Sequence, residues 1–476
     1  MKVGLYSIKE IIKATRGDLI TGSLDLKVGG ISTDTRTLFK GDLFIALKGE
    51  KFDGHCFLEE ALKKGAVGAV ISEKVKSEKI TIKVKDTLQA LGDIAKIHRE
   101  KFSKIKVIAV TGSNGKTTTK EMLGFCLSKR FNVLKAKASF NNFVGVPLTL
   151  LEVKKDTRIV ILEMETNILG GIRRLADVAK PSVGIVTNIG DTHLQFLKTR
   201  ENVFKEKAEL IKSLPDKGIA VLNSDDPYIV KMKELAKGRR VITFGIKNKS
   251  DDFRASHIKI KDMRLEFILN DQYKIRLNTI LCANVYNALS TVAATHSVFG
   301  LNLKAVAAYL EEFRFPPMRM ELVRLKDIEI INDCYNANPQ SMREALLTFK
   351  NIHPVRNTKS SRRGNKISNG VNTSGRRIAV LGDMLELGQN SADFHYQLGK
   401  LCGTCQIDIL VTVGNLAQHI ANGAKEAGML KKNILNFDDT RDAAHVLSNI
   451  LKPKDVILIK GSRKMDMGKI VEWLNY

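Results

Sequence analysis

The feature that most constrains this chain is a glycine-rich turn at residues 111–118, which reads Thr-Gly-Ser-Asn-Gly-Lys-Thr-Thr. It follows an apolar, β-branched run at residues 107–110 and precedes a helix that we expect over residues 116–129. Glycines let backbone N–H groups approach a phosphate, and the start of a helix adds positive potential there. This order of strand, turn and helix predicts an α/β fold with a nucleotide phosphate at one edge of a parallel sheet.

Two residues of the turn have specific expected roles. Lys116 is placed to contact the β- and γ-phosphates, and the Thr117 hydroxyl to ligate Mg²⁺. The turn is shorter than a strict Walker A motif, because Val110 stands where that motif has glycine. A chance Gly-Lys-Thr turn is the alternative interpretation. The expected nucleotide-binding residues of the turn are Thr111, Gly112, Ser113, Asn114, Gly115, Lys116, Thr117 and Thr118.

Two further polar residues follow apolar runs that we expect to be strands of the same sheet. Glu163 ends the run at residues 159–162, and His193 follows the run at residues 183–186. The carboxyl ends of parallel strands meet at one sheet edge, so both side chains should lie near the phosphate turn. A carboxylate and an imidazole in that position predict a metal site. Taken alone, each residue is more often a structural polar group.

Lys207 lies on the apolar face of a helix that we expect over residues 201–214. It falls between Val203 and Ile211 at i, i+4 spacing. A lysine that faces a core is unfavourable unless it is paired or neutralised. This position makes Lys207 a candidate functional residue, and the alternative is a side chain that reaches water at a domain interface.

The length of the chain and its proline-rich break predict three domains. At about 100–200 residues per domain, 476 residues correspond to about three. Apolar runs separated by helices predict mostly parallel sheets that are covered on both faces. We expect a small N-terminal α/β domain at residues 1–85, a central P-loop ATPase at 86–314 and a C-terminal α/β domain at 315–476, which begins at Phe315-Pro-Pro. The expected strands lie at residues 42–47, 67–72, 107–110, 159–162, 183–186, 328–332, 377–381, 407–413 and 456–459, and the expected early helices at 8–14 and 57–64.

Charge is the unusual part of the composition. The chain has 77 Lys and Arg against 51 Asp and Glu, a net charge of +26, which is compatible with nucleic acid, an anionic substrate or a basic proteome. Part of the excess is concentrated at residues 354–377, which are also rich in Ser, Asn and Gly and predict a disordered basic insertion. No apolar run approaches the roughly 20 residues of a membrane span, and the N-terminus lacks a signal-peptide pattern. We therefore expect a cytoplasmic protein without stable membrane insertion.

The six cysteines are too few and too scattered for a disulfide framework. Cys402 and Cys405 form a CxxC pair, but no second pair or histidine cluster accompanies it. Two thiols on an ordinary helix are the favoured interpretation, with a structural zinc as the alternative.

Motifs in order along nearly the whole chain resemble the Mur ligase superfamily. The phosphate turn is followed by Lys-Glu-Met at 120–122, Asn-Asn-Phe-Val-Gly-Val-Pro-Leu-Thr-Leu-Leu at 141–151 and Thr-Asn-Ile-Gly-Asp-Thr-His-Leu at 187–194. Pro-Met-Arg-Met-Glu at 317–321 also fits.

Three later motifs are most similar to the family member that adds D-alanyl-D-alanine. They are Asp-Cys-Tyr-Asn-Ala-Asn-Pro-Gln-Ser-Met at 333–342, Leu-Gly-Asp-Met-Leu-Glu-Leu-Gly at 381–388 and Lys-Gly-Ser-Arg at 460–463. The resemblance implies an N-terminal domain for a UDP-sugar, a central ATPase and a C-terminal Rossmann-like ligase domain. It implies that ATP and Mg²⁺ convert the terminal carboxylate of UDP-N-acetylmuramoyl-tripeptide to an acyl phosphate, from which the amine of D-Ala-D-Ala displaces phosphate. It also implies no nucleic-acid partner and a monomer.

The same resemblance assigns individual residues. Lys116, Lys207 and His193 are the implied catalytic residues, and Lys207 carries a carbamate formed from CO₂. The implied metal ligands are Thr117, Glu163, His193 and the carbamate of Lys207. Asn287, Arg319 and Asp333 join the turn in nucleotide binding. The implied substrate-binding residues are Asp34, Thr35, Arg36, Lys48, Gly49, Asp53, Asn142, Asn336 and Asn338. Ordinary turn chemistry is the alternative for the N-terminal polar residues.

The sequence departs from the family pattern after Glu163. The family usually has Met-Gly, a small residue and a Pro-Gly-Glu turn, whereas this chain has Met-Glu-Thr-Asn-Ile-Leu-Gly-Gly at 164–171. Glu165 thus adds a negative charge beside the expected metal site. The adenine motif also begins Cys-Ala at 282–283, where the family often has Arg-His.

Three other functions are alternatives to this one. The sibling ligase that adds the third amino acid carries an Asp-Asn-Pro-Arg motif that this chain lacks. Folylpolyglutamate synthase shares the ATPase but not the N-terminal domain. From a different class, a basic P-loop chain could be a nucleic-acid-dependent ATPase or binding module, whose affinity would fall steeply with salt.

Overall fold

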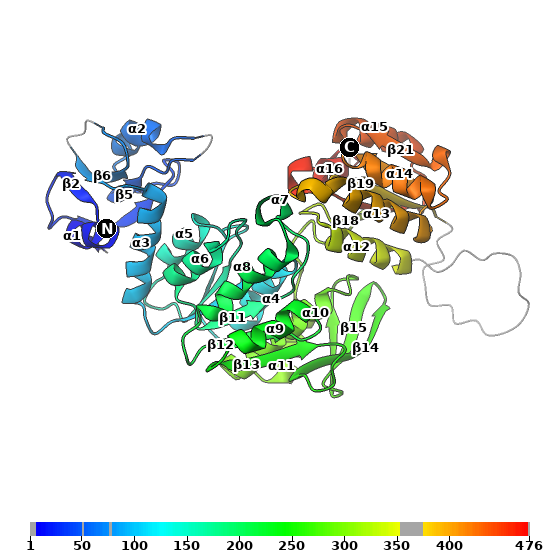
Figure 1. The fold of residues 1–476 in the computed structure, drawn as a ribbon, viewed down its shortest axis with the longest axis horizontal. Helices are drawn as coiled ribbons and strands as arrows, with labels where there is room; N and C mark the ends of the chain where they lie inside the picture. Colours follow the sequence, from blue (N-terminus) through cyan, green and yellow to red (C-terminus); the bar gives the residue numbers. More distant parts are fainter. Residues whose placement is uncertain (1–5, 50–51, 76–78, 353–374, 475–476) are drawn as a thin grey trace, which may run out of the picture.

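The computed structural model describes residues 6–49, 52–75, 79–352 and 375–474. Three larger β-sheets lie in three lobes along the long axis of the molecule, and the central lobe separates the N-terminal lobe from the C-terminal lobe (Figure 1). This arrangement confirms the predicted three-domain, mostly parallel α/β fold. The exact domain boundaries stay a proposal.

The N-terminal lobe is built on a five-stranded sheet of order β2-β7-β6-β5-β4. The strands pair in parallel, except that β2 runs antiparallel to β7. Leu43 and Ile45 face one core, while Phe44 and Ala46 face another, so both faces of the sheet are covered. The elements are β1 (Tyr6–Ser7), α1 (Ile8–Thr15), β2 (Asp18–Thr21), β3 (Lys27–Val28), β4 (Gly30–Ser32), β5 (Asp42–Ile45), α2 (Leu58–Lys63), β6 (Gly68–Ile71) and β7 (Ile80–Lys83).

Helix α3 (Thr87–Lys101) connects the first two lobes and packs against both. It begins where Asp86 accepts hydrogen bonds from the N–H groups of Leu88 and Gln89, a standard N-cap. Its residue Leu91 belongs to the N-terminal core, whereas Ala95 belongs to the central core. The helix is therefore a shared element rather than a loose linker.

The central sheet has nine strands in the order β16-β15-β14-β13-β12-β11-β8-β10-β9. All neighbours from β9 to β14 are parallel, and β14, β15 and β16 form an antiparallel extension. Ile108 and Val110 pack on one face, and Val107 and Ala109 on the other, as expected for a doubly covered strand. The strands are β8 (Lys106–Thr111), β9 (Val133–Lys135), β10 (Ile159–Glu163), β11 (Val183–Val186), β12 (Ile219–Asn223), β13 (Arg240–Gly245), β14 (Phe253–Lys261), β15 (Arg264–Leu269) and β16 (Tyr273–Leu277). The helices are α4 (Lys116–Ser128), α5 (Gly145–Leu151), α6 (Gly171–Ala179), α7 (Leu194–Leu197), α8 (Arg200–Lys212), α9 (Pro227–Leu235), α10 (Asn284–Phe299) and α11 (Leu303–Glu312).

The C-terminal sheet has six strands in the order β17-β18-β22-β19-β20-β21, of which only the pair β17 and β18 is antiparallel. The strands are β17 (Glu321–Leu325), β18 (Ile328–Asn332), β19 (Arg377–Gly382), β20 (Ile409–Val413), β21 (Ile434–Phe437) and β22 (Val456–Lys460). The helices are α12 (Pro339–Ile352), α13 (Ser391–Thr404), α14 (Gln418–Glu426), α15 (Thr440–Ile450) and α16 (Gly468–Leu474).

The predicted basic insertion at 354–377 lies mostly outside the described residues, but its last part is wrong. Arg377 is buried and begins β19. Arg376 pairs with the buried carboxylate of Asp455 at 2.6 Å. Arg377 is thus part of the sheet and Arg376 is held just before it, where the charge pattern alone suggested a polar loop.

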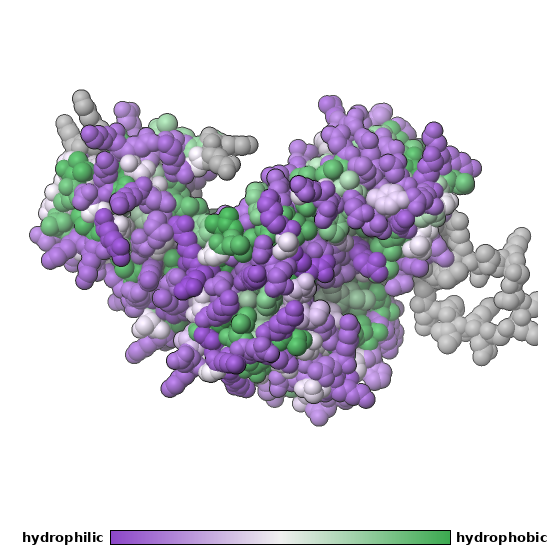
Figure 2. Space-filling model, viewed as in Figure 1, coloured by the Kyte–Doolittle hydropathy of each residue, from purple (hydrophilic) through white to green (hydrophobic). Residues whose placement is uncertain are grey.

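Hydrophilic side chains dominate the surface in the view of Figure 2, with hydrophobic residues in small groups among them. No helix among the described residues is long and apolar enough to cross a membrane.

Candidate functional site

The glycine-rich turn connects β8 to α4 at the carboxyl edge of the central sheet. Gly112 has φ of +146° and Gly115 has φ of +81°. A Cβ at these positions would lie 2.0 Å from Oγ1 of Thr187 and 2.2 Å from Oδ1 of Asn287, respectively. The two glycines are therefore required by close approach as well as by backbone conformation. Oδ1 of Asn188 accepts a hydrogen bond from the N–H of Asn114 at 2.7 Å and fixes the turn.

The turn opens onto a cleft of about 770 Å³ between the central and C-terminal lobes. Most of the predicted nucleotide residues line it, together with Glu163, Glu165, His193, Asn336 and Asn338. The nucleotide residues that line it are Ser113, Asn114, Gly115, Lys116, Thr117, Thr118, Asn287, Arg319 and Asp333. Thr111, Gly112 and Lys207 lie behind this surface, because Thr111 and Lys207 are wholly buried and Gly112 packs on Thr187.

Glu163 and Thr117 meet at the end of β10. The Thr117 hydroxyl donates to Oε2 of Glu163 at 2.8 Å. The side-chain amide of Asn141 donates to Oε1 of the same carboxylate at 2.9 Å. The predicted convergence of Glu163 on the phosphate turn is thus present, with Asn141 as a partner that the sequence reasoning missed.

Glu165 is the centre of charge in the site. Its carboxylate forms ion pairs with the ammonium groups of Lys116 and Lys207. It also lies 3.4 Å from Nε2 of His193. Burial disfavours the charged carboxylate, but the two lysines outweigh this effect and hold the pKa of Glu165 well below its usual value.

His193 links the central lobe to the C-terminal lobe. It has φ of +55° and immediately precedes α7. Its Nδ1 is 2.8 Å from Oε2 of Glu386, which belongs to the motif at 381–388. Burial opposes protonation of this imidazole, but the hydrogen bonds with Glu165 and Glu386 raise the pKa of His193. The C-terminal lobe therefore orients the imidazole.

The C-terminal lobe also reaches the phosphate turn directly. The Asn338 amide donates to Oδ1 of Asn114 at 2.7 Å. Asp333 accepts a hydrogen bond from Lys460 at 2.6 Å, which holds it at the wall of the cleft. The Asn336 side chain accepts a hydrogen bond from the N–H of Arg463. Residues 333–342 thus line the side of the cleft that faces the turn.

Arg319 presents a cation that the described residues do not pair with an acid. Its guanidinium carbon lies 3.9 Å from the centroid of the Tyr335 ring. Its Nε is buried without a hydrogen-bond partner among the described residues. An unsatisfied buried donor at the wall of a cleft suits an anionic ligand.

Asn287 and Asn142 are held by other protein groups. Asn287 accepts a hydrogen bond from Thr119 and donates one to Asn284 at 2.8 Å, and it lines the cleft. Asn142 accepts hydrogen bonds from the N–H groups of Val144 and Gly145 at the start of α5. It does not line the 770 Å³ cleft.

The N-terminal residues of the predicted substrate site lie in a different lobe. Asp34 pairs with Arg36, whose guanidinium and N–H lower the pKa of Asp34 to about 2. Thr35 is buried, and its carbonyl accepts a hydrogen bond from Lys64 at 3.2 Å. Gly49 donates its N–H to the carbonyl of Phe52.

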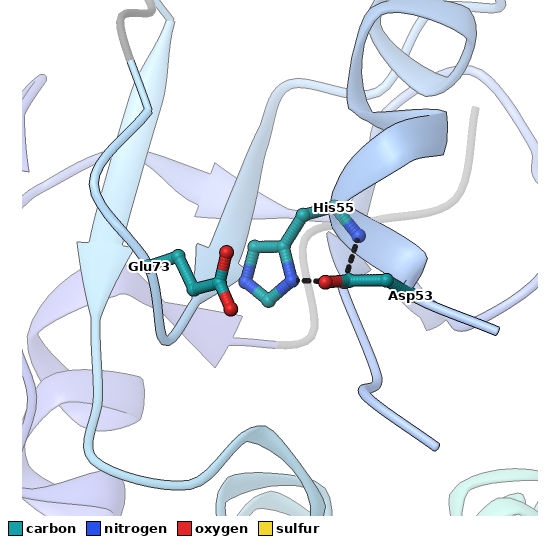
Figure 3. A group of neighbouring side chains, drawn as sticks. All are labelled: Asp53, His55 and Glu73. Carbon is teal, nitrogen blue, oxygen red and sulfur yellow. Dashed lines mark hydrogen bonds and ion pairs between the residues drawn. The ribbon is translucent and has the colours of Figure 1, made fainter. Parts of the chain in front are cut away.

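Lys48 and Asp53 belong to a polar cluster of this lobe that also includes His55 and Glu73. Figure 3 shows Asp53 and Glu73 on opposite sides of the His55 ring. Nδ1 of His55 is 2.6 Å from Asp53, and its Nε2 accepts the N–H of Ser72 at 3.0 Å. The Lys48 ammonium lies 2.5 Å from Glu73 and 3.9 Å from Asp53. Both imidazole nitrogens and both carboxylates therefore have protein partners.

The CxxC cysteines lie at the end of α13. Cys402 and Cys405 are free and buried. The favoured reading of two thiols on a helix fits this position, because burial raises the pKa of both thiols.

Comparison with known proteins defines the class. The Mur ligase family catalytic-domain model matches residues 27–99, the Mur ligase middle-domain model matches 110–295, and the Mur ligase glutamate ligase domain model matches 366–463. The chain belongs to the Mur ligase family.

Full-length relatives narrow the comparison within the family. The UDP-N-acetylmuramoyl-tripeptide–D-alanyl-D-alanine ligase of Bacillus subtilis is 32% identical, over 98% of this chain and 97% of that protein. A crystal structure of MurF from Acinetobacter baumannii superposes with a TM-score of 0.86 at 29% identity and covers 99% of this chain and 100% of that chain. MurF ligase from Thermotoga maritima in complex with ADP superposes with a TM-score of 0.80 at 26% identity, over 94% of this chain and 97% of that chain.

Proposed function

We propose that this chain is the ATP-dependent ligase that joins D-alanyl-D-alanine to UDP-N-acetylmuramoyl-tripeptide in peptidoglycan precursor synthesis. The full-length similarity to ligases of that name supports this reading over the sibling that adds the third amino acid. The cleft carries the proposal, because it combines a phosphate turn, a set of oxygen and nitrogen ligands and the C-terminal motif 333–342.

ATP binding is assigned to the cleft. The relative from Thermotoga maritima was crystallised with ADP. In this chain Gly112 and Gly115 leave room at the turn, and Lys116 and Arg319 offer positive charge. Asn287 and Asp333 line the remaining walls, where we place the adenine and the ribose.

The donor set fits a divalent cation. Thr117, Glu163 and His193 would hold Mg²⁺, since hydroxyl and carboxylate oxygens are its usual ligands and imidazole is an accepted one. When bound, the ion neutralises negative charge on the phosphates and on the reacting carboxylate. Glu386 orients His193 through its Nδ1, as outer partners of histidine ligands commonly do.

The chemistry is activation of a carboxylate followed by displacement. A carboxylate oxygen of the tripeptide attacks the γ-phosphorus of ATP, ADP leaves, and an acyl phosphate forms. The amine of D-Ala-D-Ala then attacks the acyl carbon, and phosphate leaves through a tetrahedral intermediate. Lys116 stabilises the transferring phosphoryl group, and preorganised positive groups of this kind are a large contribution to phosphoryl transfer.

The UDP-sugar end of one substrate and the dipeptide substrate are assigned to different lobes. We place the UDP-sugar at the N-terminal residues Asp34, Thr35, Arg36, Lys48, Gly49 and Asp53. Asn142, which accepts hydrogen bonds at the start of α5, is assigned to the same substrate. Asn336 and Asn338 on the C-terminal side are proposed to receive the dipeptide, because Asn338 already contacts the phosphate turn.

Four finer points belong to the same proposal. The reaction is placed in the cytoplasm, where ATP is available, and the protein is expected to act as a monomer. Peptidoglycan supply connects the reaction to cell shape and division. The carbamate on Lys207 stays a prediction from the resemblance. In this structure the Lys207 side chain forms an ion pair with Glu165.

The direct test is phosphate release from ATP with Mg²⁺, UDP-N-acetylmuramoyl-tripeptide and D-Ala-D-Ala. We expect release to require both substrates, and a parallel assay with diaminopimelate or lysine at the third peptide position identifies the natural tripeptide. Release that needs neither substrate, or that needs nucleic acid, would reject the proposed function.

A further inference from the structure

Glu165 is a charged residue of the cleft for which the proposed reaction gives no role. It follows β10 after Met164, and its side chain is 15% exposed. One carboxylate oxygen contacts Lys116 and the other contacts Lys207. The latter oxygen is also 3.4 Å from Nε2 of His193. All three residues expected to be catalytic thus meet at one carboxylate.

Lys207 has no access to water. The exposed fraction of its side chain is 0%, and its ammonium donates to Oε1 of Glu165. The side chains before and after it on the same face, Val203 and Ile211, are buried and apolar. Glu165 is therefore the group that neutralises this lysine, and a buried ammonium needs such a partner.

A second buried lysine, Lys120, has both a carboxylate partner and backbone partners, and its ammonium lies 3.2 Å from Oε1 of Glu121. The exposed fraction of Lys120 is also 0%, and its ammonium donates to the carbonyls of Ala136 at 2.8 Å and Ala138 at 3.0 Å. Lys120 therefore holds the backbone after β9. Lys207 instead pairs with Glu165, whose carboxylate also contacts Lys116 of the phosphate turn.

A carbamate on Lys207 would conflict with this arrangement. It would replace the positive charge that Glu165 contacts by a negative one, at hydrogen-bond distance from a carboxylate. Like charges at that distance in a partly buried site repel strongly. The space among Lys116, Lys207 and His193 already contains one carboxylate, and it is the carboxylate of Glu165.

We propose that Glu165 supplies the anion that a carbamate would otherwise supply, and that Lys207 stays unmodified and positions Glu165 between Lys116 and His193. This inference deepens the proposed function and rests on it for the role of the site. Glu165 stands where the resembling motif usually has glycine, so the substitution of one anion for the other is a property of this chain.

The chemistry of the alternative makes the inference testable. To form a carbamate, the lone pair of an uncharged Nζ attacks the carbon of CO₂, so an N–C bond forms while one C–O π bond breaks and its electron pair moves to oxygen. An N–H bond then breaks and its proton passes to water. The Glu165 carboxylate, which contacts Nζ, opposes the negative group that this step would create beside it. Removal of the carboxylate leaves the amine without its partner, and CO₂ then restores a negative charge.

The test is ¹³C NMR of the full-length protein equilibrated with ¹³C-bicarbonate, without ATP or substrates. We expect no carbamate resonance from the wild type and one resonance from Glu165→Gly. The resonance should be lost when Lys207→Arg is added and kept when Lys120→Arg is added instead. Glu165→Gln, which keeps the side-chain size, is the second variant in case the glycine variant does not fold.

A carbamate resonance in the wild type that Lys207→Arg removes would overturn the inference. Absence of the resonance from both folded Glu165 variants would also overturn it, because Glu165 would then not be the group that keeps CO₂ from Lys207. The NMR result does not depend on ligase activity, so it can fail while phosphate release still supports the proposed function.

Discussion

The cleft and the N-terminal polar cluster organise charge in opposite ways. In the cleft, Lys116, Glu165 and Lys207 come from three separate segments and are at most 15% exposed. In the N-terminal lobe, Arg36 pairs with a neighbour two residues away, and Lys48 pairs across the surface while remaining 58% exposed. The charges of the cleft interact strongly because they are largely buried. The charges of the N-terminal lobe interact more weakly because water screens them. We therefore expect the cleft to set the rate and the N-terminal lobe to set substrate affinity.

Lys116 and Lys48 provide the largest contrast. We expect Lys116→Met to lower kcat/KM by about 10²–10³-fold, because it removes a preorganised charge from the phosphoryl group. Lys48→Met should raise the KM for UDP-N-acetylmuramoyl-tripeptide by about tenfold with little change in kcat, as loss of uniform binding does. Steady-state phosphate release measures both. Equal effects of the two variants on kcat would break the comparison.

Lys207 and Lys205 allow a buried and an exposed lysine of the same helix to be compared. Lys207 is buried with Glu165, whereas Lys205 is exposed. Lys207→Met should lower the apparent free energy of unfolding by about 3 kcal/mol, the low end for breaking a buried pair, since Glu165 retains Lys116. Lys205→Met should change it by less than about 0.5 kcal/mol. Urea denaturation measures the difference, and equal stabilities would mean that water reaches Lys207.

The labelling rates of the cysteines also distinguish the cleft from the N-terminal lobe, with a moderate expected effect. Cys56 in the N-terminal lobe and Cys282 next to the cleft are exposed, and the other four cysteines are buried. A disulfide reagent should modify these two thiols of the native protein several-fold faster than the rest; burial raises the pKa of Cys126 to about 12, which keeps that thiol protonated. ATP with Mg²⁺ should slow the labelling of Cys282 and leave Cys56 unchanged, as followed by peptide mass spectrometry. Protection of Cys56 alone would place the nucleotide elsewhere.

The ion pair between His193 and Glu386 should make the smallest contribution, and this contribution is to the pH dependence of stability. The pKa of His193 is raised, so its contribution to stability is present below the unfolded value of about 6.5 and is lost as pH rises through the raised value. The pKa of Glu386 is lowered, so its contribution is lost only as pH falls below about 4.5. Because Glu386 is 36% exposed, the link contributes about 0.2–1 kcal/mol.

The measurement is the difference in melting temperature between the wild type and Glu386→Gln. We expect this difference to be larger at pH 6 than at pH 9. Glu426→Gln is the control, because Glu426 pairs with Lys400, which does not titrate in this range. A difference for Glu386→Gln that grows with pH would contradict the assigned ion pair.

The elements of the parallel sheets could be predicted from sequence because their signals are local. The runs at 183–186 and 328–332 coincide with β11 and β18. The prediction missed the antiparallel strands β14 to β16, whose alternating residues include many charged ones such as Lys259 and Lys261. It also missed β12 and β13.

The candidate site could be predicted in part for the same reason. Motif position placed Thr117 and Glu163 together, and they form a hydrogen bond. The apolar stripe identified Lys207 as buried, but no spacing rule could reveal its partner. Glu165 lies 42 residues away in the chain and was noted only as an added charge. Contacts between lobes, such as that of His193 with Glu386, depend on tertiary geometry that a sequence pattern does not contain.

The most direct test of the central claim follows an oxygen atom. UDP-N-acetylmuramoyl-tripeptide labelled with ¹⁸O in its terminal carboxylate is incubated with the protein, ATP, Mg²⁺ and D-Ala-D-Ala. If that carboxylate attacks the γ-phosphorus, the released phosphate carries one ¹⁸O atom from it for each new peptide bond. Peptide product accompanied by unlabelled phosphate would contradict the acyl-phosphate route and the assignment of the cleft as its site.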